Sequence, residues 1–191
     1  GSLTVIPSSP ADLADDPAGH AVVLDAVRRA RETLRLSWRT GNHLVLQRGP
    51  YVVAAGMDEA VDEATLQLPG IYVNLFDPAL SVVVDPEIAP DTRWLLYDLG
   101  RCPPHPWVIA AAGRVVDEAY DDHSLCFAVE GIADTLCAVR VHVPARPIAA
   151  TAGGSAARVD WDAASRTACL TFPNDPSGVA VRMVWAADRT T

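Results

Sequence analysis

Short hydrophobic runs with a period of two fill the sequence from His43 to Trp185, and they constrain the fold more than any other feature. Successive side chains of a β-strand point to opposite faces, so this alternation is typical of strands with one buried and one polar face. Turn residues separate about ten to twelve such runs. The pattern predicts a mainly β protein, an antiparallel β-sandwich of the jelly-roll or immunoglobulin-like type. Alternating strand–helix units are missing from the pattern, which argues against a doubly wound fold or a complete (β/α)₈ barrel.

Two runs in the second half of the chain, together with the last strand, predict most clearly which side chains face the core. In SLCFAVEG (124–131) the apolar positions alternate with polar or small ones. In TLCAVRVHV (135–143) they alternate with Arg140 and His142, which we therefore expect to face outward. The side chains expected inside are Leu125, Phe127, Val129, Cys137, Val139, Val141, Val143, Val179, Val181, Met183 and Trp185.

The sequence predicts one helix, which precedes the strands. Asp16 followed by Pro17 is typical of an N-cap with proline at the first helical position. Apolar residues then recur at three- and four-residue spacing, as on one face of a helix. We therefore predict an irregular lead-in over residues 1–15, one amphipathic helix over 16–36 and a β-sandwich domain over 43–186.

The charge of the chain excludes several classes of function. All 15 basic residues are Arg, and 24 acidic residues give a formal net charge of −9. A field of this sign repels phosphate backbones, so we expect no nucleic-acid partner. No stretch approaches the roughly 18 consecutive apolar residues of a membrane helix, and Gly1-Ser2-Leu3 does not begin a signal peptide. We expect a soluble protein with no membrane partner; its compartment is unknown.

The four cysteines show no metal-binding pattern. Cys102, Cys126, Cys137 and Cys169 form neither a CxxC pair nor a Cys/His cluster at zinc spacing. We therefore expect neither a metal nor another cofactor. Three of the cysteines lie inside apolar strand patterns, where buried free thiols are common. A disulfide between neighbouring strands is the alternative.

Motifs that would name a reaction are missing from the sequence. It has no GxSxG nucleophile elbow and no phosphate-binding loop with its lysine, so we assign no catalytic residue. Asp58, Glu59, Asp62 and Glu63 lie close together in the sequence, and paired carboxylates perform acid–base chemistry in sugar hydrolysis. We expect these four residues to form a solvated loop instead.

A second group of residues gives alternative acid–base candidates. Asp121, Asp122 and His123 follow a predicted strand, and His105 lies in the proline-rich loop RCPPHPW (101–107). Two acids and an imidazole at a strand end are able to hold a calcium ion, or to serve as a base and the group that orients it. A tight turn is the simpler interpretation of residues 121–123, because Asp side chains bond their own backbone in turns.

Aromatic side chains on or beside strands are the candidates for carbohydrate contact. Sugar rings stack on flat aromatic faces through their apolar C–H surfaces, which makes Trp94, Tyr97, Trp107 and Tyr120 candidates. Trp94 and Tyr97 are three residues apart and point to opposite faces of their strand, so at least one of them should lie in the core. Packing in the sandwich core is the alternative for the aromatic residues as a group.

The order of elements resembles a known enzyme family. A lone amphipathic helix leads directly into LVLQRGPYVVAAGMDE (44–59), and this resembles the junction in many glycoside hydrolases where the last barrel helix gives way to a C-terminal β-sandwich. The segment GIYVNLFDPALSVVVDPEIAPDTRWLLYDL (70–99) and the final hairpin over 161–185 are similar to the rest of that accessory domain. The resemblance implies a non-catalytic module. No catalytic residue is carried over, because none of the family's catalytic motifs is present.

These observations give one leading hypothesis and two alternatives. The leading hypothesis is a non-catalytic β-sandwich module of a carbohydrate-active enzyme, which supports a catalytic domain in cis or in trans and contacts glycan. One alternative is a small stand-alone hydrolase that uses the Asp and His candidates on loops at the mouth of the sandwich. The other is a structural protein-interaction domain that buries the apolar face of the predicted helix against a partner.

Overall fold

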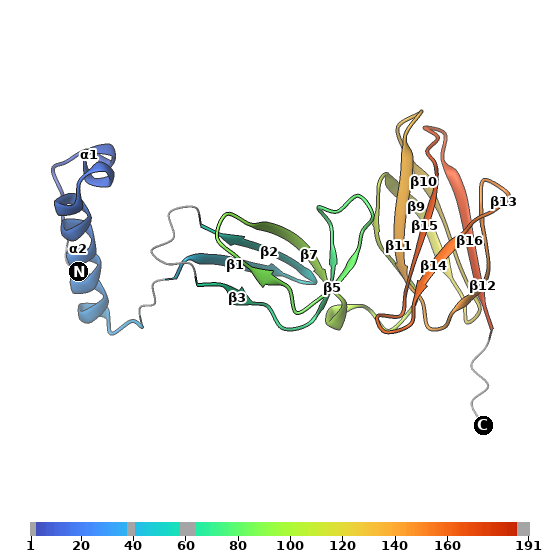
Figure 1. Ribbon diagram of the computed structural model, residues 1–191, viewed down its shortest axis with the longest axis horizontal. Coiled ribbons are helices and arrows are strands. Elements are labelled where there is room, and N and C mark those ends of the chain that lie inside the picture. The colour runs from blue at the N-terminus through green and yellow to red at the C-terminus, as the bar shows by residue number, and fades with distance from the viewer. Residues whose placement is uncertain (1–2, 38–40, 58–63, 187–191) are drawn as a thin grey trace, which may run out of the picture. The chain divides into compact units, whose positions relative to one another are not determined.

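The computed structural model describes residues 3–37, 41–57 and 64–186, and the chain divides into two compact units (Figure 1). The first unit, Gly1–Gly41, holds the two α-helices, and the second, Asn42–Thr191, holds the described strands. Every described strand pair is antiparallel, which confirms the predicted mainly β, antiparallel class. Among the described helices, none is long and apolar enough to cross a membrane.

The predicted helix is present as α2 (Pro17–Leu34). Asp16 caps it, because its side chain accepts a hydrogen bond from the Ala18 N–H at 3.1 Å. The helix ends two residues earlier than position 36 because Arg35 takes a left-handed backbone conformation at φ 53°. Its apolar residues stay largely exposed, and Gly19 is its one buried residue.

A shorter helix corrects the prediction for the lead-in over residues 1–15. Residues Pro10–Asp15 form α1, which begins where the Ser9 side chain accepts a hydrogen bond from the Asp12 N–H at 3.2 Å. Six residues are too few to show a helical period, so the pattern did not reveal this helix. Gly19 lets the two helices approach, since a Cβ at that position would lie 2.8 Å from the Leu13 Cα.

The strands of the first half form a five-stranded sheet of their own in the order β1-β2-β7-β4-β5, here called the first sheet. Its β1–β2 hairpin turns through two residues, and Gly49 takes the first central position at φ 58°. Glycine adopts this backbone conformation without steric strain. The strands of the first sheet are β1 (His43–Arg48), β2 (Tyr51–Gly56), β4 (Ile71–Asn74), β5 (Val82–Val84) and β7 (Arg93–Asp98), and β3 (Leu66–Gln67) pairs separately with β6 (Glu87–Ile88).

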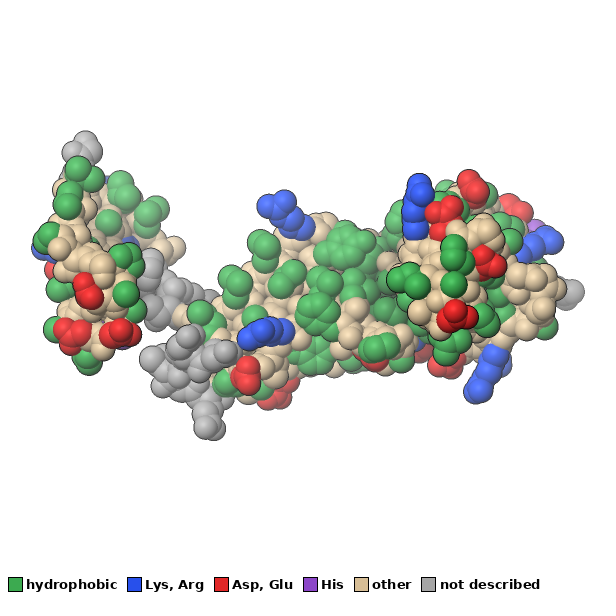
Figure 2. All heavy atoms as spheres, turned by 90° about the horizontal axis from the view of Figure 1, so that it is seen from above, with side chains coloured by type: hydrophobic (Ala, Val, Ile, Leu, Met, Phe, Trp, Pro, Cys, Tyr) green, Lys and Arg blue, Asp and Glu red, His purple; other side chains and the backbone are tan. Residues whose placement is uncertain are grey.

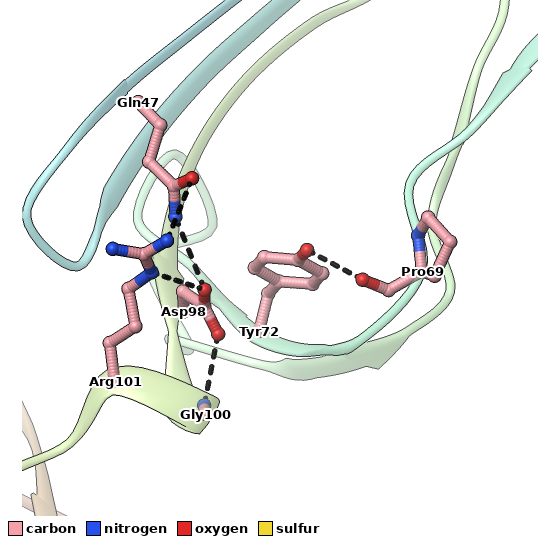
Figure 3. Close-up of polar contacts among 6 residues, drawn as sticks. All are labelled: Gln47, Pro69, Tyr72, Asp98, Gly100 and Arg101. Carbon is pink, nitrogen blue, oxygen red and sulfur yellow. Dashed lines mark hydrogen bonds and ion pairs between the residues drawn. The ribbon is translucent and has the colours of Figure 1, made fainter.

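Polar contacts connect β1 and β7 to the segment that leaves the first sheet (Figure 3). Asp98 accepts hydrogen bonds from the Gly100 N–H at 2.9 Å and from the Gln47 side-chain amide at 3.3 Å. Arg101 lies in the 3₁₀-helix η1 (Leu99–Arg101), forms an ion pair with Asp98 at 3.4 Å and donates to Gln47 Oε1 at 3.3 Å. The network joins η1 to both β1 and β7.

The second half of the chain forms the β-sandwich, shown in yellow to red in Figure 1. One layer has the order β14-β15-β11-β8, here called the four-stranded sheet, and the other has the order β13-β12-β16-β10-β9. The strands are β8 (Trp107–Ala111), β9 (Arg114–Tyr120), β10 (Ser124–Glu130), β11 (Leu136–His142), β12 (Pro147–Ala152), β13 (Ser155–Ala156), β14 (Val159–Asp162), β15 (Thr167–Pro173) and β16 (Val179–Trp185).

The core of the sandwich follows the predicted alternation. Ten of the eleven side chains expected inside are at most 3% exposed, and Val179 is partly buried against the same cluster. The cluster draws residues from both layers, as a two-layer sandwich requires. The sandwich therefore occupies residues 107–185, and the remainder of the predicted domain, 43–98, forms the first sheet.

The first sheet has little core of its own. On one face, Val52, Tyr72 and Leu96 are at most 5% exposed, and the Tyr72 hydroxyl donates to the Pro69 carbonyl oxygen at 2.8 Å (Figure 3). The opposite face contributes to a cluster that includes Ile109 of β8. The first sheet and the sandwich therefore share a hydrophobic cluster.

The shared cluster explains why Arg140 does not face solvent as predicted. Arg140 lies on the outer face of the four-stranded sheet, on the side opposite Val139 and Val141, but it is only 6% exposed. Leu80, on the loop between β4 and β5, belongs to the cluster, and Ala138 of β11 packs against it. Strand alternation predicts which face a residue occupies, but not whether a neighbouring loop covers that face.

All four cysteines are described, and all are free thiols. Cys137 is buried, while Cys102, Cys126 and Cys169 are partly buried. The structure therefore agrees with the expectation of free thiols and not with an inter-strand disulfide. Burial raises the pKa of Cys102 to about 11, so this thiol stays protonated at neutral pH and is a poor nucleophile.

Candidate functional site

Three rings gather at one end of the sandwich and form what we call the aromatic cluster: His105, Trp107 and Tyr120. The His105 and Tyr120 rings are stacked, with centroids 4.7 Å apart and an interplanar angle of 29°. The His105 and Trp107 rings meet edge to face at 6.1 Å. Trp107 is 37% exposed and Tyr120 is 53% exposed, so both present ring surface to solvent.

The fold brings these residues together because the chain reverses between β8 and β9. Trp107 begins β8 and Tyr120 ends β9, so the reversal places them at the same end of the sandwich. A bulge in β9, with Asp117 at φ 55°, interrupts the register with β10. Next to the bulge, Glu118 accepts a hydrogen bond from the Val108 N–H at 2.9 Å and ties β9 to β8.

His142 lies directly across the four-stranded sheet from Trp107. It was predicted to face outward, and it is partly buried on that outer face. Burial lowers the pKa of His142, and a backbone hydrogen bond to His105 only partly opposes this effect. The His142 imidazole therefore remains neutral at pH 7 and adds no positive charge beside the aromatic cluster.

The two remaining carbohydrate candidates lie in the first sheet. Tyr97 is 2% exposed and packs edge to face against Tyr51 at 5.4 Å, so it cannot stack on a sugar. Burial raises its pKa to about 12. Trp94 is partly buried against the cluster of Val52, Tyr72 and Leu96 on the other face. Tyr97 thus confirms the expectation that at least one of Trp94 and Tyr97 lies in the core.

The alternative acid–base candidates at 121–123 form a turn. The Asp121 carboxylate accepts hydrogen bonds from the His123 N–H at 2.8 Å and from the Ser124 N–H at 2.7 Å and hydroxyl at 3.0 Å. The Asp122 carbonyl accepts the Trp185 indole N–H at 3.0 Å. Both residues thus have structural contacts that account for their positions.

His105 is not joined to these acids. In the described part of the chain, no side-chain hydrogen bond links His105 to Asp121, Asp122 or His123, and its ring packs on Tyr120. Asp58, Glu59, Asp62 and Glu63 lie outside the described residues. No group of three or more His, Cys, Asp or Glu side chains within residues 3–37, 41–57 and 64–186 is arranged to hold a metal ion.

We predict that the turn at Asp121 makes stability depend on acid pH. Hydrogen bonds from the His123 backbone, then from Ser124, lower the pKa of Asp121 in the folded protein. A depressed carboxyl pKa adds stability above the unfolded value near 3.9, and this stability is lost as the pH falls through the folded value. Asp121→Ala should therefore lower the melting temperature at pH 7 and flatten its fall between about pH 5 and pH 3.

The control for this prediction is Asp122→Ala. The Asp122 carboxylate makes no hydrogen bond to a described residue, while its backbone contact to Trp185 is kept in the variant. Thermal unfolding of the three proteins across the pH range measures the effect. Parallel acid profiles for Asp121→Ala and the unaltered protein would contradict the prediction.

The fold and the site define a β-sandwich module with an aromatic cluster on its surface. No protein-family model matches the sequence, and no curated protein matches it. Solved structures similar to this chain include two of the GH31 dextranase FjDex31A from Flavobacterium johnsoniae, a mutant in complex with isomaltotriose and a complex with glucose. In each case the identity is 10%, the TM-score is 0.37, and the match covers 71% of this chain.

The aligned region spans only 26% of the dextranase chain. A likeness at this identity and TM-score is a distant one to part of a glycoside hydrolase, and it supports no conclusion about what this chain binds. The function proposed below therefore rests on the residues of the chain itself.

Proposed function

We propose that this chain is a non-catalytic β-sandwich module that contacts carbohydrate through the aromatic cluster, as an accessory to a catalytic domain. The observation that carries the proposal is that Trp107 and Tyr120, both partly exposed, lie together around His105 at one end of the sandwich. Trp and Tyr offer large, rigid apolar faces with a polar tip. Such faces suit a sugar ring, which is apolar on its C–H surface and polar at its rim.

Several features of the cluster favour stacking over chemistry. His105 covers part of the Tyr120 ring and holds it in place, so little side-chain freedom is lost on binding. Three prolines in the segment 103–106 restrict the backbone that carries His105.

We predict that Trp107→Ala and Tyr120→Ala each weaken binding to soluble polysaccharide by about tenfold, because each removes one stacking face from the contact. Affinity electrophoresis in gels that contain dextran, laminarin, xylan or mannan measures the retardation. Release of reducing sugar is assayed on the same four polysaccharides, and we expect none.

Phe76→Ala is the matched control for this experiment. Phe76 is an aromatic side chain, 61% exposed, on the loop between β4 and β5. Its loss should leave the retardation unchanged. Equal retardation of the unaltered protein and the Trp107→Ala variant, or hydrolysis by the chain itself, would refute the proposed function.

A second candidate function is self-association through the first sheet, and a specific surface favours it. Leu44, Leu46, Tyr51 and Val53 lie on one face of the β1–β2 hairpin and are 42–60% exposed. Figure 2 shows hydrophobic side chains gathered over this part of the chain. Contiguous apolar surface of this kind is typical of protein contacts.

A second copy of the chain suits this surface because β1 is an edge strand, paired in the described sheet with β2 alone. Arg48, at its end, is the one Arg, Asp or Glu residue of β1. Antiparallel pairing of two β1 strands about Leu46 places Arg48 opposite Leu44, so like charges stay apart. The apolar face would then continue across both copies.

We predict that Leu46→Lys abolishes this association, because edge strands with lysine resist pairing. Light scattering at increasing protein concentration measures the mass of both proteins. Ile148→Lys, at a site that is 71% exposed on the sandwich, controls for added charge. A monomeric mass for the unaltered protein at every concentration would exclude the second candidate.

A further inference from the structure

A cleft of ≈ 500 Å³ lies on the outer face of the four-stranded sheet, where the loop between β4 and β5 meets it. Ala79 and Ser81 line it from the loop, and Arg140 and Arg158 line it from the sandwich. The Cys169 thiol, 3.8 Å from the Ala79 carbonyl oxygen, closes one side. The cleft shares no residue with the aromatic cluster.

Arg140 is the unusual residue of this cleft, because it is a buried cation that forms no ion pair with a described residue. It is 6% exposed, and no carboxylate of a described residue forms an ion pair with it. Its Nη1 donates to Thr167 Oγ1 at 2.8 Å, and Thr167 in turn contacts the Ser165 hydroxyl at 2.8 Å. This hydrogen-bonded chain holds the guanidinium but does not neutralise it.

The other edge of the Arg140 guanidinium has no acceptor. Nε is fully buried without a hydrogen-bond partner, and no described residue accepts a hydrogen bond from Nη2. The N–H groups of Nε and Nη2 form the parallel fork that matches the two oxygens of a carboxylate. A buried charge left unpaired opposes folding, so such an arrangement is typical of a site whose partner arrives from outside the chain.

The charges around the cleft indicate which anion fits. Arg158 adds a second guanidinium, and Asp160 contributes one carboxylate, which leaves one net positive charge among the lining residues. Asp77 also lies near Arg140, and its oxygens accept hydrogen bonds from the Ser81 side chain and from the backbone N–H groups of Ala79 at 2.9 Å and Ser81 at 3.3 Å. The two guanidinium groups attract an anion, and the Asp160 and Asp77 carboxylates nearby disfavour one that carries more than a single charge.

We propose that this cleft binds the carboxylate group of a small acid, held between Arg140 and Arg158. Thr171, which also lines the cleft, supplies a hydroxyl group for the remaining polar atoms of the ligand. The two arginines come from β11 and from the segment before β14, and the loop from the first sheet forms the opposite wall. The site exists only because the first sheet and the sandwich pack together.

The test uses the Nε–Hε cross-peak of Arg140 in a ¹H–¹⁵N spectrum of the whole chain, which is identified by its loss in Arg140→Met. Sodium acetate and sodium D-glucuronate are titrated against sodium chloride at equal ionic strength. We expect the position of this peak to approach a limiting value as either carboxylate is added. With chloride we expect no such limit. Arg158→Met should weaken the binding of both by about tenfold, because a charge-assisted hydrogen bond is lost.

Arg140→Lys keeps the positive charge but removes the two parallel N–H groups. This variant replaces Arg140→Met in the test if Arg140→Met does not fold. Calorimetry with D-glucuronate should show at least about tenfold weaker binding to it, since lysine cannot bind a carboxylate bidentately. Arg182→Met, on the exposed side of β16, should bind like the unaltered protein. A shift that follows ionic strength alone, or tighter saturation by inorganic phosphate than by either carboxylate, would overturn the proposal.

Discussion

Replacing Trp185 by Ala should lower the free energy of unfolding by about 4 kcal/mol, as is usual when a buried Trp is truncated. Trp185 ends the last strand and is 3% exposed within the sandwich core. Its backbone N–H donates to the His123 carbonyl oxygen, and its indole N–H donates to the Asp122 carbonyl oxygen, both at 3.0 Å. The side chain thus fills the core and also fastens the turn that follows β9.

Trp185→Phe separates these two contributions. An aromatic ring remains in the core, but the indole N–H is lost and the Asp122 carbonyl oxygen loses that hydrogen bond. We therefore expect the free energy of unfolding to fall by about 1–2 kcal/mol. Guanidinium denaturation followed by circular dichroism measures both variants. Ile148→Ala, at an exposed site, should change the stability by less than about 0.5 kcal/mol. A Trp185→Ala protein as stable as this control would show that the last strand does not close the core.

Gly56→Ala should destabilise the first sheet by about 3 kcal/mol, at the upper end of ordinary overpacking effects. Gly56 ends β2 and donates its N–H to the Thr92 carbonyl oxygen at 2.9 Å. A Cβ there would overlap the Ala89 carbonyl oxygen and lie 2.7 Å from the Ala89 carbonyl carbon and 2.9 Å from the Pro90 Cα. These neighbours are backbone atoms, so no side-chain rotation relieves the overlap.

The control for Gly56→Ala is Gly41→Ala, because a Cβ at Gly41 would meet nothing within 4 Å. Thermal unfolding compares the two variants with the unaltered protein. We expect the Gly41→Ala melting temperature to stay unchanged and that of Gly56→Ala to fall. Equal melting temperatures would mean that the strands β2 and β6 separate readily at this point.

The sandwich was predictable because its core strands face the interior on one side only. Leu125, Phe127 and Val129 alternate with less apolar residues, and burial follows that alternation directly. Arg140 and Tyr97 show where the same reasoning ends. Each lies where the first sheet and the sandwich pack together, and this packing depends on contacts between distant parts of the chain.

The candidate site was predictable only residue by residue. Trp107, Tyr120 and His105 were each identified as aromatic or titratable residues near strands, but under two different hypotheses. Their meeting depends on the reversal between β8 and β9, which carries the chain from one layer of the sandwich to the other. No spacing in the sequence reports such a change of layer, so the stacked pair was visible only in three dimensions.

The hydrophobic cluster around Ile109 also determines how the protein should be dissected. Ile109 is 5% exposed because Val73 and Tyr97 of the first sheet and Leu80 of the loop between β4 and β5 pack with it. Ala110 and Ala138 lie against the same cluster. A truncated chain that began at β8 would turn this surface outward, on the face where Arg140 lies. Fragments meant to report on binding should therefore keep residues 42–186 together, since the apparent boundary before β8 runs through shared core.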